Sequence, residues 1–161
     1  MALSKTRVAY AAGFFDGEGH ISIPFRNRPN RRTKRTSILR LDIGQAVVEP
    51  LRIVKSTLGG SIDLGWKRRK LYRWYLSDNK AALALQAMLP YLVVKRAEAE
   101  VALAYWAKRQ ASKGSGKRGN PVTMPLAQQE HYANALKELR RLKSFKYRQA
   151  SEELINVTEA K

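Results

Sequence analysis

Alternating apolar and polar residues predict two β-hairpins in the first half of the chain. Apolar side chains occupy every second position over residues 20–26 and 38–45, on either side of a basic segment, and again over 61–67 and 72–76. A period of two places successive side chains on opposite faces of a strand, which is the pattern of a half-buried β-strand. Each hairpin therefore has one apolar face for a core and one polar face that stays open.

Helices are predicted in the intervals around these hairpins. They cover about residues 4–16, 47–58, 78–89, 92–110 and 126–143. Ser4 is expected to cap the first helix, and Gly59-Gly60 to end the second, because a helix C-terminus favours glycine at positive φ. The order predicts an α+β domain, α-β-β-α-β-β-α, with a twisted four-stranded antiparallel sheet and C-terminal helices. We expect its core at 1–110, a basic loop at 111–125, and the C-terminal helix and tail of the same domain at 126–161.

The charge of the chain narrows the class of partner. Lys and Arg number 31 and Asp and Glu 13 in 161 residues, so the formal net charge is +18. Cysteine is absent and only two histidines are present, which excludes disulfides and histidine-rich or thiolate metal centres. No apolar run approaches the roughly 20 residues that cross a bilayer, and the start lacks a signal-peptide pattern. We expect an intracellular protein, in a prokaryotic cytoplasm or an organelle, with no membrane or small-molecule partner and with a polyanion as its target.

Basic residues concentrate at the tips and on the open faces of the predicted hairpins. A β-ribbon of this kind fits the major groove of DNA. Ribosomal proteins also combine basic hairpins with α+β cores, so charge and pattern leave DNA and RNA as equal alternatives. Two further basic clusters, at 108–118 and 137–148, are equally consistent with a solvated face.

The first predicted helix ends in an unusual segment, AAGFFDGEG at 11–19. Ala9, Gly13 and Gly17 share one stripe at a spacing of four, where small residues let two helices approach closely. Glycine inside a helix costs about 1 kcal/mol relative to alanine, so close packing would explain Gly13. The acidic residues Asp16 and Glu18 follow in a tight turn. Taken alone, that turn is also typical of an ordinary glycine-capped helix end.

This nonapeptide resembles the signature of the LAGLIDADG homing endonucleases, with Glu18 at its acidic eighth position and Ala11 in place of the leading leucine. Three later features follow in the family's order: Gln45 at a strand end, the segment LGGSI at 58–62, and PYLVVKR at 90–96. The resemblance covers about residues 5–110. It implies an intron- or intein-encoded enzyme that makes a staggered double-strand break in a long, near-palindromic DNA site.

The resemblance also implies a metal-dependent active site. Glu18 and the carbonyl of Gly17 would hold Mg²⁺; Mn²⁺ or Ca²⁺ can occupy the same site, and Ca²⁺ is not expected to support cleavage. Gln45 would position water or metal, and Lys95 would offset charge that develops on the phosphate. Two plainer interpretations remain open. Lys95 could be an exposed lysine paired with Glu98, and Gln45 an ordinary polar residue at a strand end.

One motif in so short a chain implies a homodimer in which the motif helices pack about a two-fold axis. The residues expected at that interface are Ala9, Ala12, Gly13 and Asp16, and Asp16 is also expected to have a structural role at the helix end. Two other functions occur on this fold: an RNA-binding splicing cofactor (a maturase) and a catalytically silent DNA-binding regulator. The retained Glu18, Gln45 and Lys95 argue against both.

Strand parity selects the residues expected to contact DNA. Those on the open face are Pro24, Arg26, Arg28, Thr36, Ile38, Arg40, Asp42, Arg73 and Tyr75, and those at the tips are Arg31, Arg32, Lys34, Lys67, Arg68, Arg69 and Lys70. Open-face arginines can fork onto guanine O6 and N7, whereas tip residues are expected to meet phosphates. Asp42 either accepts a hydrogen bond from cytosine N4 or orients Arg40.

Overall fold

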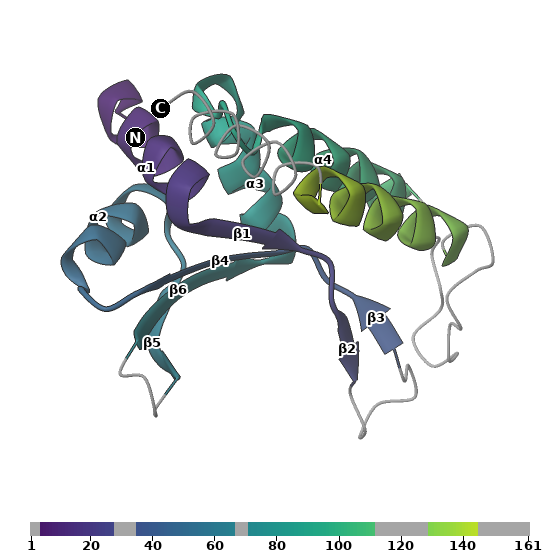
Figure 1. Ribbon diagram of the computed structural model, residues 1–161, viewed down its shortest axis with the longest axis horizontal. Coiled ribbons are helices and arrows are strands. Elements are labelled where there is room, and N and C mark those ends of the chain that lie inside the picture. Colours follow the sequence, from purple (N-terminus) through teal and green to yellow (C-terminus); the bar gives the residue numbers. More distant parts are fainter. Residues whose placement is uncertain (1–3, 28–34, 67–70, 112–128, 145–161) are drawn as a thin grey trace, which may run out of the picture.

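A layer of helices covers one face of an antiparallel sheet, and the other face is open (Figure 1). The computed structural model describes residues 4–27, 35–66, 71–111 and 129–144. In chain order the elements are α1 (Lys5–Glu18), β1 (Gly19–Ser22), β2 (Phe25–Asn27), β3 (Arg35–Ser37), β4 (Arg40–Gln45), α2 (Glu49–Leu58), β5 (Ser61–Trp66), β6 (Leu71–Ser77), α3 (Asp78–Met88), the 3-10 turn η2 (Leu89–Tyr91), α4 (Arg96–Ala111) and a C-terminal helix over 129–144. The predicted α+β architecture is confirmed. No helix among the described residues is long and apolar enough to span a membrane.

The main sheet has the strand order β1-β4-β6-β5, and all of its pairs are antiparallel. The predicted alternation is confirmed at its centre, where Leu41, Ile43, Trp74 and Leu76 are buried beneath the helices. Their neighbours on β4 and β6 lie on the opposite, open face. Figure 1 shows the sheet as an arch, with the β5–β6 hairpin at one end and the β2–β3 ribbon at the other.

The first predicted hairpin is interrupted at Pro24. Its outer part forms a separate two-stranded ribbon, in which Phe25 pairs with Ser37. Proline has no N–H to donate to a ladder, so β1 ends before it. Where the two parts meet, Ile38 N donates to Pro24 O at 3.0 Å. Residues 38–39 belong to neither strand, and the period-two alternation fails there. Ile38, which we expected on the open face, is therefore buried.

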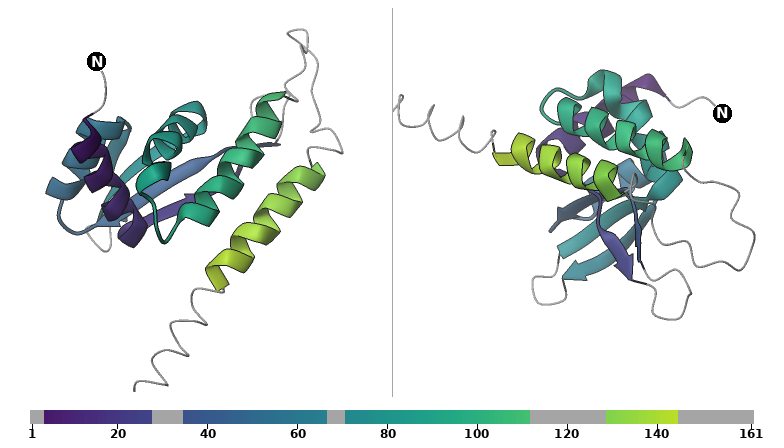
Figure 2. Two further views of the ribbon diagram at one scale, coloured as in Figure 1. Left: turned by 90° about the horizontal axis from the view of Figure 1, so that it is seen from above. Right: turned by 90° about the vertical axis from the view of Figure 1, so that its right-hand side faces the viewer.

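The C-terminal helix packs beside α4 (Figure 2). Its Ala135 and Leu139 join the core, and Tyr132 meets Tyr105 of α4 edge-on, with ring centroids 6.3 Å apart. At its far end, Lys143 Nζ donates to Ile21 O of the edge strand β1 at 2.9 Å. This helix thus adds apolar contacts to the core and gives one carbonyl of the edge strand β1 a hydrogen-bond partner.

Helix α2 ends at two glycines with positive φ, as predicted: 78° at Gly59 and 96° at Gly60. Gly59 O accepts a hydrogen bond of 2.8 Å from the indole Nε1 of the buried Trp74, which fixes the turn to the sheet. Ser4 occupies the N-cap position of α1, as predicted, but its side chain makes no capping hydrogen bond.

We expect Gly60→Ala to destabilise the fold more than Gly59→Ala. Both substitutions force a side chain into positive φ, at a cost of about 1–3 kcal/mol. At Gly60 the new Cβ would also lie 2.8 Å from Trp74 Nε1 and 2.8 Å from Tyr75 O, whereas at Gly59 it would meet nothing within 4 Å. Urea unfolding followed by circular dichroism measures both free energies. Equal destabilisation by the two variants would show that the packing against Trp74 contributes nothing.

Candidate active site and nucleic-acid interface

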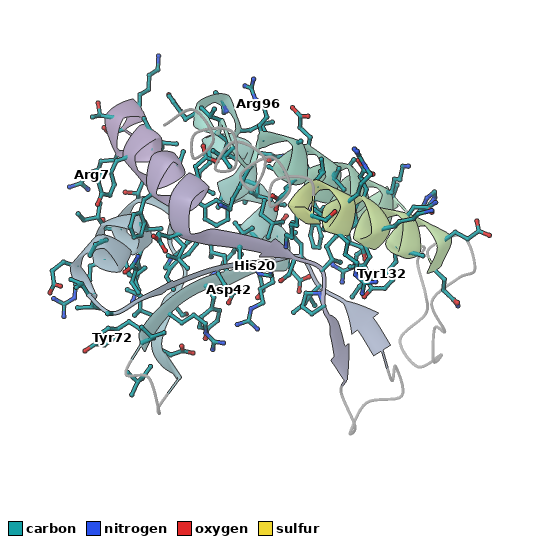
Figure 3. The ribbon with its side chains drawn as sticks, in the orientation of Figure 1. Arg7, His20, Asp42, Tyr72, Arg96 and Tyr132 are labelled. Atoms are coloured by element: carbon teal, nitrogen blue, oxygen red, sulfur yellow. The ribbon has the colours of Figure 1, made fainter. Side chains whose placement is uncertain are left out.

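The open face of the sheet contains a hollow of about 510 Å³. Its walls come from the end of α1, from β1, β4 and β6, and from the segment between β1 and β2: Glu18, His20, Ser22, Pro24, Arg40, Asp42, Gly44 and Arg73. His20 and Asp42 are cross-strand partners and lie together beneath the sheet in Figure 3, away from Arg96 on the helical side. The hollow thus combines one acidic residue at a helix end with a floor of polar and charged strand residues.

Glu18 is the last residue of α1 and is exposed at one end of this hollow. The neighbouring Gly17 is exposed as well, and an added Cβ would meet nothing within 4 Å. Carbonyls in the last turn of a helix lack intrahelical partners. One carboxylate and at least one backbone carbonyl oxygen, that of Gly17, are therefore available side by side where α1 meets the sheet.

Asp16 ties the end of α1 to the turn that leads into α4. Its carboxylate accepts the backbone N–H groups of Val93 at 2.6 Å, Val94 at 3.2 Å and Lys95 at 2.8 Å. The Lys95 ammonium donates in return to the backbone carbonyl oxygen of Asp16. Lys95 is half-buried, so it is not an ordinary exposed lysine. These bonds place the Lys95 ammonium at the same helix end as Glu18.

Gln45 reaches this corner from the sheet. It is the last residue of β4, and Gly19 of β1 pairs with Ile43, two residues before it. The end of β4 therefore runs past the point where α1 joins β1. Gln45 is half-buried and shares the strand parity of Leu41 and Ile43, so it belongs to the helical side of the strand. The structure thus places Lys95 at the helix end that carries Glu18, and the sheet register places Gln45 two residues beyond the β4 partner of Gly19.

The donor set at this corner suits a metal ion that completes its coordination with water and phosphate oxygens. Across the described residues, no group of three or more histidine or acidic side chains is placed to hold a metal. Mg²⁺ at nucleotide-processing sites needs no such cage, because one or two carboxylates are completed by water and substrate phosphate oxygens. Glu18, which lines the hollow, and the carbonyl of the exposed Gly17 beside it fit that requirement.

The charged residues on the sheet floor form pairs. Arg40 bonds Asp42 Oδ1 through Nε at 3.0 Å and Nη2 at 2.9 Å, so Asp42 orients Arg40, the second of its two expected roles. Arg73 makes a two-point contact with Asp63, at 3.2 Å from Nε and 2.8 Å from Nη2. The hydrogen bonds that Arg73 donates to the Asp63 carboxylate raise the pKa of Arg73. Sequence reasoning missed Asp63, although the hairpin register alone pairs it with Arg73.

His20 and Lys143 are a second pair that the sequence did not reveal. Lys143 Nζ lies 2.8 Å from His20 Nε2, a contact across 123 positions of the chain. Partial burial and the nearby ammonium of Lys143 lower the pKa of His20. The C-terminal helix therefore reaches the strand that begins directly after Glu18. No spacing rule could have found this pair, because it depends on how that helix docks.

Several expected contact residues have a different place or lie outside the described part. Ala12 is fully buried and Asp16 almost so, which removes both side chains from any interface with a second chain. Gly13 is exposed and Ala9 is half-buried on α1, and Pro24 lines the hollow. The structure does not describe the side chains of Arg26 and Thr36, nor any part of Arg28, Arg31, Arg32, Lys34, Lys67, Arg68, Arg69 and Lys70.

No protein-family model and no curated protein matches the sequence. Solved structures do. The homing endonuclease I-CvuI in complex with its target, in the presence of calcium, matches with a TM-score of 0.59 at 20% identity, over 81% of this chain and 95% of that one. The archaeal intron-encoded homing endonuclease I-Vdi141I, complexed with DNA, matches with a TM-score of 0.56 at 19% identity, over 85% and 79%.

A third match is I-SmaMI bound to its uncleaved DNA target with calcium ions, with a TM-score of 0.56 at 18% identity, over 83% of this chain and 42% of that one. I-SmaMI is described as a LAGLIDADG homing endonuclease. The RNA-binding alternative gains no support from these matches, two of which are described as DNA complexes. The chain has the fold of the LAGLIDADG homing endonucleases.

Proposed function

We propose that this chain is a site-specific double-strand DNA endonuclease of the LAGLIDADG homing type, acting as a metal-dependent homodimer. The observation that carries the proposal is the corner at the end of α1. There an exposed Glu18 faces the sheet hollow while the Lys95 ammonium bonds the same helix end. The DNA complexes formed by its structural neighbours support the same substrate. Such an enzyme acts where genomic DNA is, inside a cell or organelle.

Glu18 and the Gly17 carbonyl would hold Mg²⁺ together with a scissile phosphate. When bound, the ion polarises the phosphate and lowers the pKa of an attacking water. Lys95 would stabilise negative charge that develops on the phosphate, because its ammonium is already fixed beside the helix end. Gln45, at the sheet end beside α1, would orient water through its amide. Each chain would cut one strand.

A second copy would complete the site. The open stripe of α1 is formed by Ala9, Gly13 and Gly17, and nothing within 4 Å would meet a Cβ at either glycine. Two such stripes can pack closely about a two-fold axis, which would place the two Glu18 residues near the two strands of one DNA. The match spans 95% of I-CvuI but only 42% of I-SmaMI, which also favours one unit per chain.

Cleavage of a randomised duplex library tests the proposal directly. The protein is incubated with the library and Mg²⁺, and the cut ends are sequenced. We expect cut ends that share a long motif with near two-fold symmetry, together with a staggered break. A library that stays intact with Mg²⁺ and with Mn²⁺, or ends without any shared motif, would contradict a site-specific nuclease.

Arg40→Ala should reduce sequence discrimination, whereas Lys34→Ala should reduce affinity for all duplexes. Arg40 lies on the floor of the hollow, so its removal should lower discrimination at one base pair per half-site by about 1–3 kcal/mol. Lys34, in the predicted hairpin tip, should weaken all duplexes alike and flatten the plot of log K against log salt by about 0.9 for each phosphate that is no longer neutralised. Binding isotherms at several salt concentrations distinguish the two. Uniform weakening by both would make Arg40 a backbone contact.

A further inference from the structure

Two arginines on the sheet floor are stacked on one tyrosine. The guanidinium carbons of Arg40 and Arg73 lie 5.3 and 5.1 Å from the centroid of the Tyr75 ring. Each guanidinium is also bonded to one carboxylate, Asp42 for Arg40 and Asp63 for Arg73. We call these five residues the arginine–tyrosine cluster. They come from three adjacent strands, β4, β6 and β5, and share one face of the sheet.

Both carboxylates occupy the same edge of their guanidinium. In each arginine, Nε and Nη2 are the atoms that donate to the aspartate. Arginine carries five N–H groups in a planar fork, so the end formed by Nη1 and the second hydrogen of Nη2 is left for another acceptor. Two parallel donors at that end match the O6 and N7 acceptors of guanine in the major groove.

Two glycines flank Arg73 on the neighbouring strands, in addition to its β5 partner Asp63. The cross-strand partner of Arg73 on β4 is Gly44. On the other side, a Cβ at Gly65 of β5 would lie only 2.8 Å from Arg73 Cβ. The side chains of Arg40 and Arg73 keep 26% and 29% of their exposure, so they are held in place yet reachable. Fixing a long side chain before binding lowers the entropy cost of the contact.

The cluster is formally neutral, with two cations and two anions. Neutralisation of phosphates by uncompensated Lys and Arg provides most of the salt-dependent, sequence-independent affinity for DNA. A compensated arginine adds little to that affinity, because its carboxylate remains beside the DNA. The cluster is therefore suited to distinguishing bases rather than to raising general affinity.

We propose that the arginine–tyrosine cluster reads two guanines in each half-site and that Asp63 is a positioning residue for this readout. Asp63 would hold the free Nη1 and Nη2 end of the Arg73 guanidinium toward the major groove of the DNA, as Asp42 would for Arg40. Tyr75, which both guanidinium groups contact, would keep them at a fixed separation. The inference rests on the proposed function, since it assumes that the sheet face receives double-stranded DNA.

Selection from a randomised duplex library, with Ca²⁺ in place of Mg²⁺, tests this with wild type, Arg73→Ala, Asp63→Asn and the control Glu49→Gln. Glu49 is an exposed acid on α2 that pairs with Arg52, so the control makes the same acid-to-amide change outside the hollow. We expect Arg73→Ala and Asp63→Asn to lose the preference for guanine at one shared position, by between about 5-fold and about 150-fold in Kd ratio. Glu49→Gln should keep it.

Two readouts separate positioning from a merely structural role. Asp63→Asn should bind a non-matching duplex at least as tightly as wild type, because it removes a negative charge near DNA. In addition, 7-deazaguanine at the shared position, which lacks the N7 acceptor, should weaken wild type but not Arg73→Ala.

Uniform weakening on all duplexes by Asp63→Asn would overturn the inference. So would a selected motif that both variants retain in full, or a 7-deazaguanine effect that persists in Arg73→Ala. Each of these results leaves the proposed nuclease intact. If wild type selects no motif at all, the proposed function fails and this inference fails with it.

Discussion

Replacing Glu18 with glutamine should abolish Mg²⁺-dependent DNA cleavage while leaving DNA binding close to that of wild type. The amide has nearly the same shape but no negative charge, so it is a poor ligand for a hard divalent cation. Removal of a metal-binding carboxylate eliminates several kcal/mol of transition-state stabilisation, and we expect the single-turnover rate to fall by at least about 10³-fold. Affinity should hold or rise slightly, because Glu18 is exposed at the hollow and its charge repels phosphates.

Single-turnover cleavage of a selected duplex, with binding measured separately by anisotropy, distinguishes the two effects. Glu49→Gln is the matched control, since it makes the same chemical change on an exposed residue of α2 and should keep full activity. Cleavage by Glu18→Gln with Mg²⁺ at a rate near that of wild type would remove Glu18 from the catalytic site. Parallel decreases in binding and cleavage would assign Glu18 to docking instead.

The core of this fold could be predicted because burial and strand period carry the same signal. Leu41, Ile43, Trp74 and Leu76 alternate in the sequence, and each is buried against the helices. The same rule failed at Ile38 for a local reason. Pro24 ends one strand pair, and the ladder resumes as a separate ribbon, so parity cannot be carried across residues 38–39.

Polar partnerships were harder to predict, because they depend on distances between elements. The sequence predicted that Asp16 lies at a helix end. It did not predict the three hydrogen bonds that the Asp16 carboxylate accepts from backbone N–H groups at and before Lys95. Asp63 could have been found, since hairpin register alone places it opposite Arg73. The contact between Lys143 and His20 could not, because it requires the docking of a helix that begins more than 100 residues later.

Gly13→Leu should convert a dimer into monomers without unfolding the chain. Gly13 is exposed on α1, and an added Cβ would meet nothing within 4 Å, so a larger side chain fits the isolated chain. Between two closely packed helices the same side chain overpacks the contact, at about 1–3 kcal/mol for each of the two copies. A total of about 2–6 kcal/mol weakens the dimer by roughly 30-fold or more.

A smaller substitution, Gly13→Ala, tests the same interface through two effects of opposite sign, on helix stability and on dimer affinity. In a monomer, Gly13→Ala should stabilise α1 by up to about 1 kcal/mol, because alanine is the better helix former. In a dimer joined at Gly13, it should instead lower the affinity between chains. Sedimentation at several concentrations, with and without duplex DNA, measures the assembly. The control is Ala107→Leu, which introduces the same side chain at an exposed position of α4. We expect wild type and Ala107→Leu to sediment as dimers, and Gly13→Leu as a folded monomer with a wild-type circular dichroism spectrum.

A wild-type monomer at micromolar concentration and on DNA would contradict the two-fold arrangement, and would require both strands to be cut by a single Glu18.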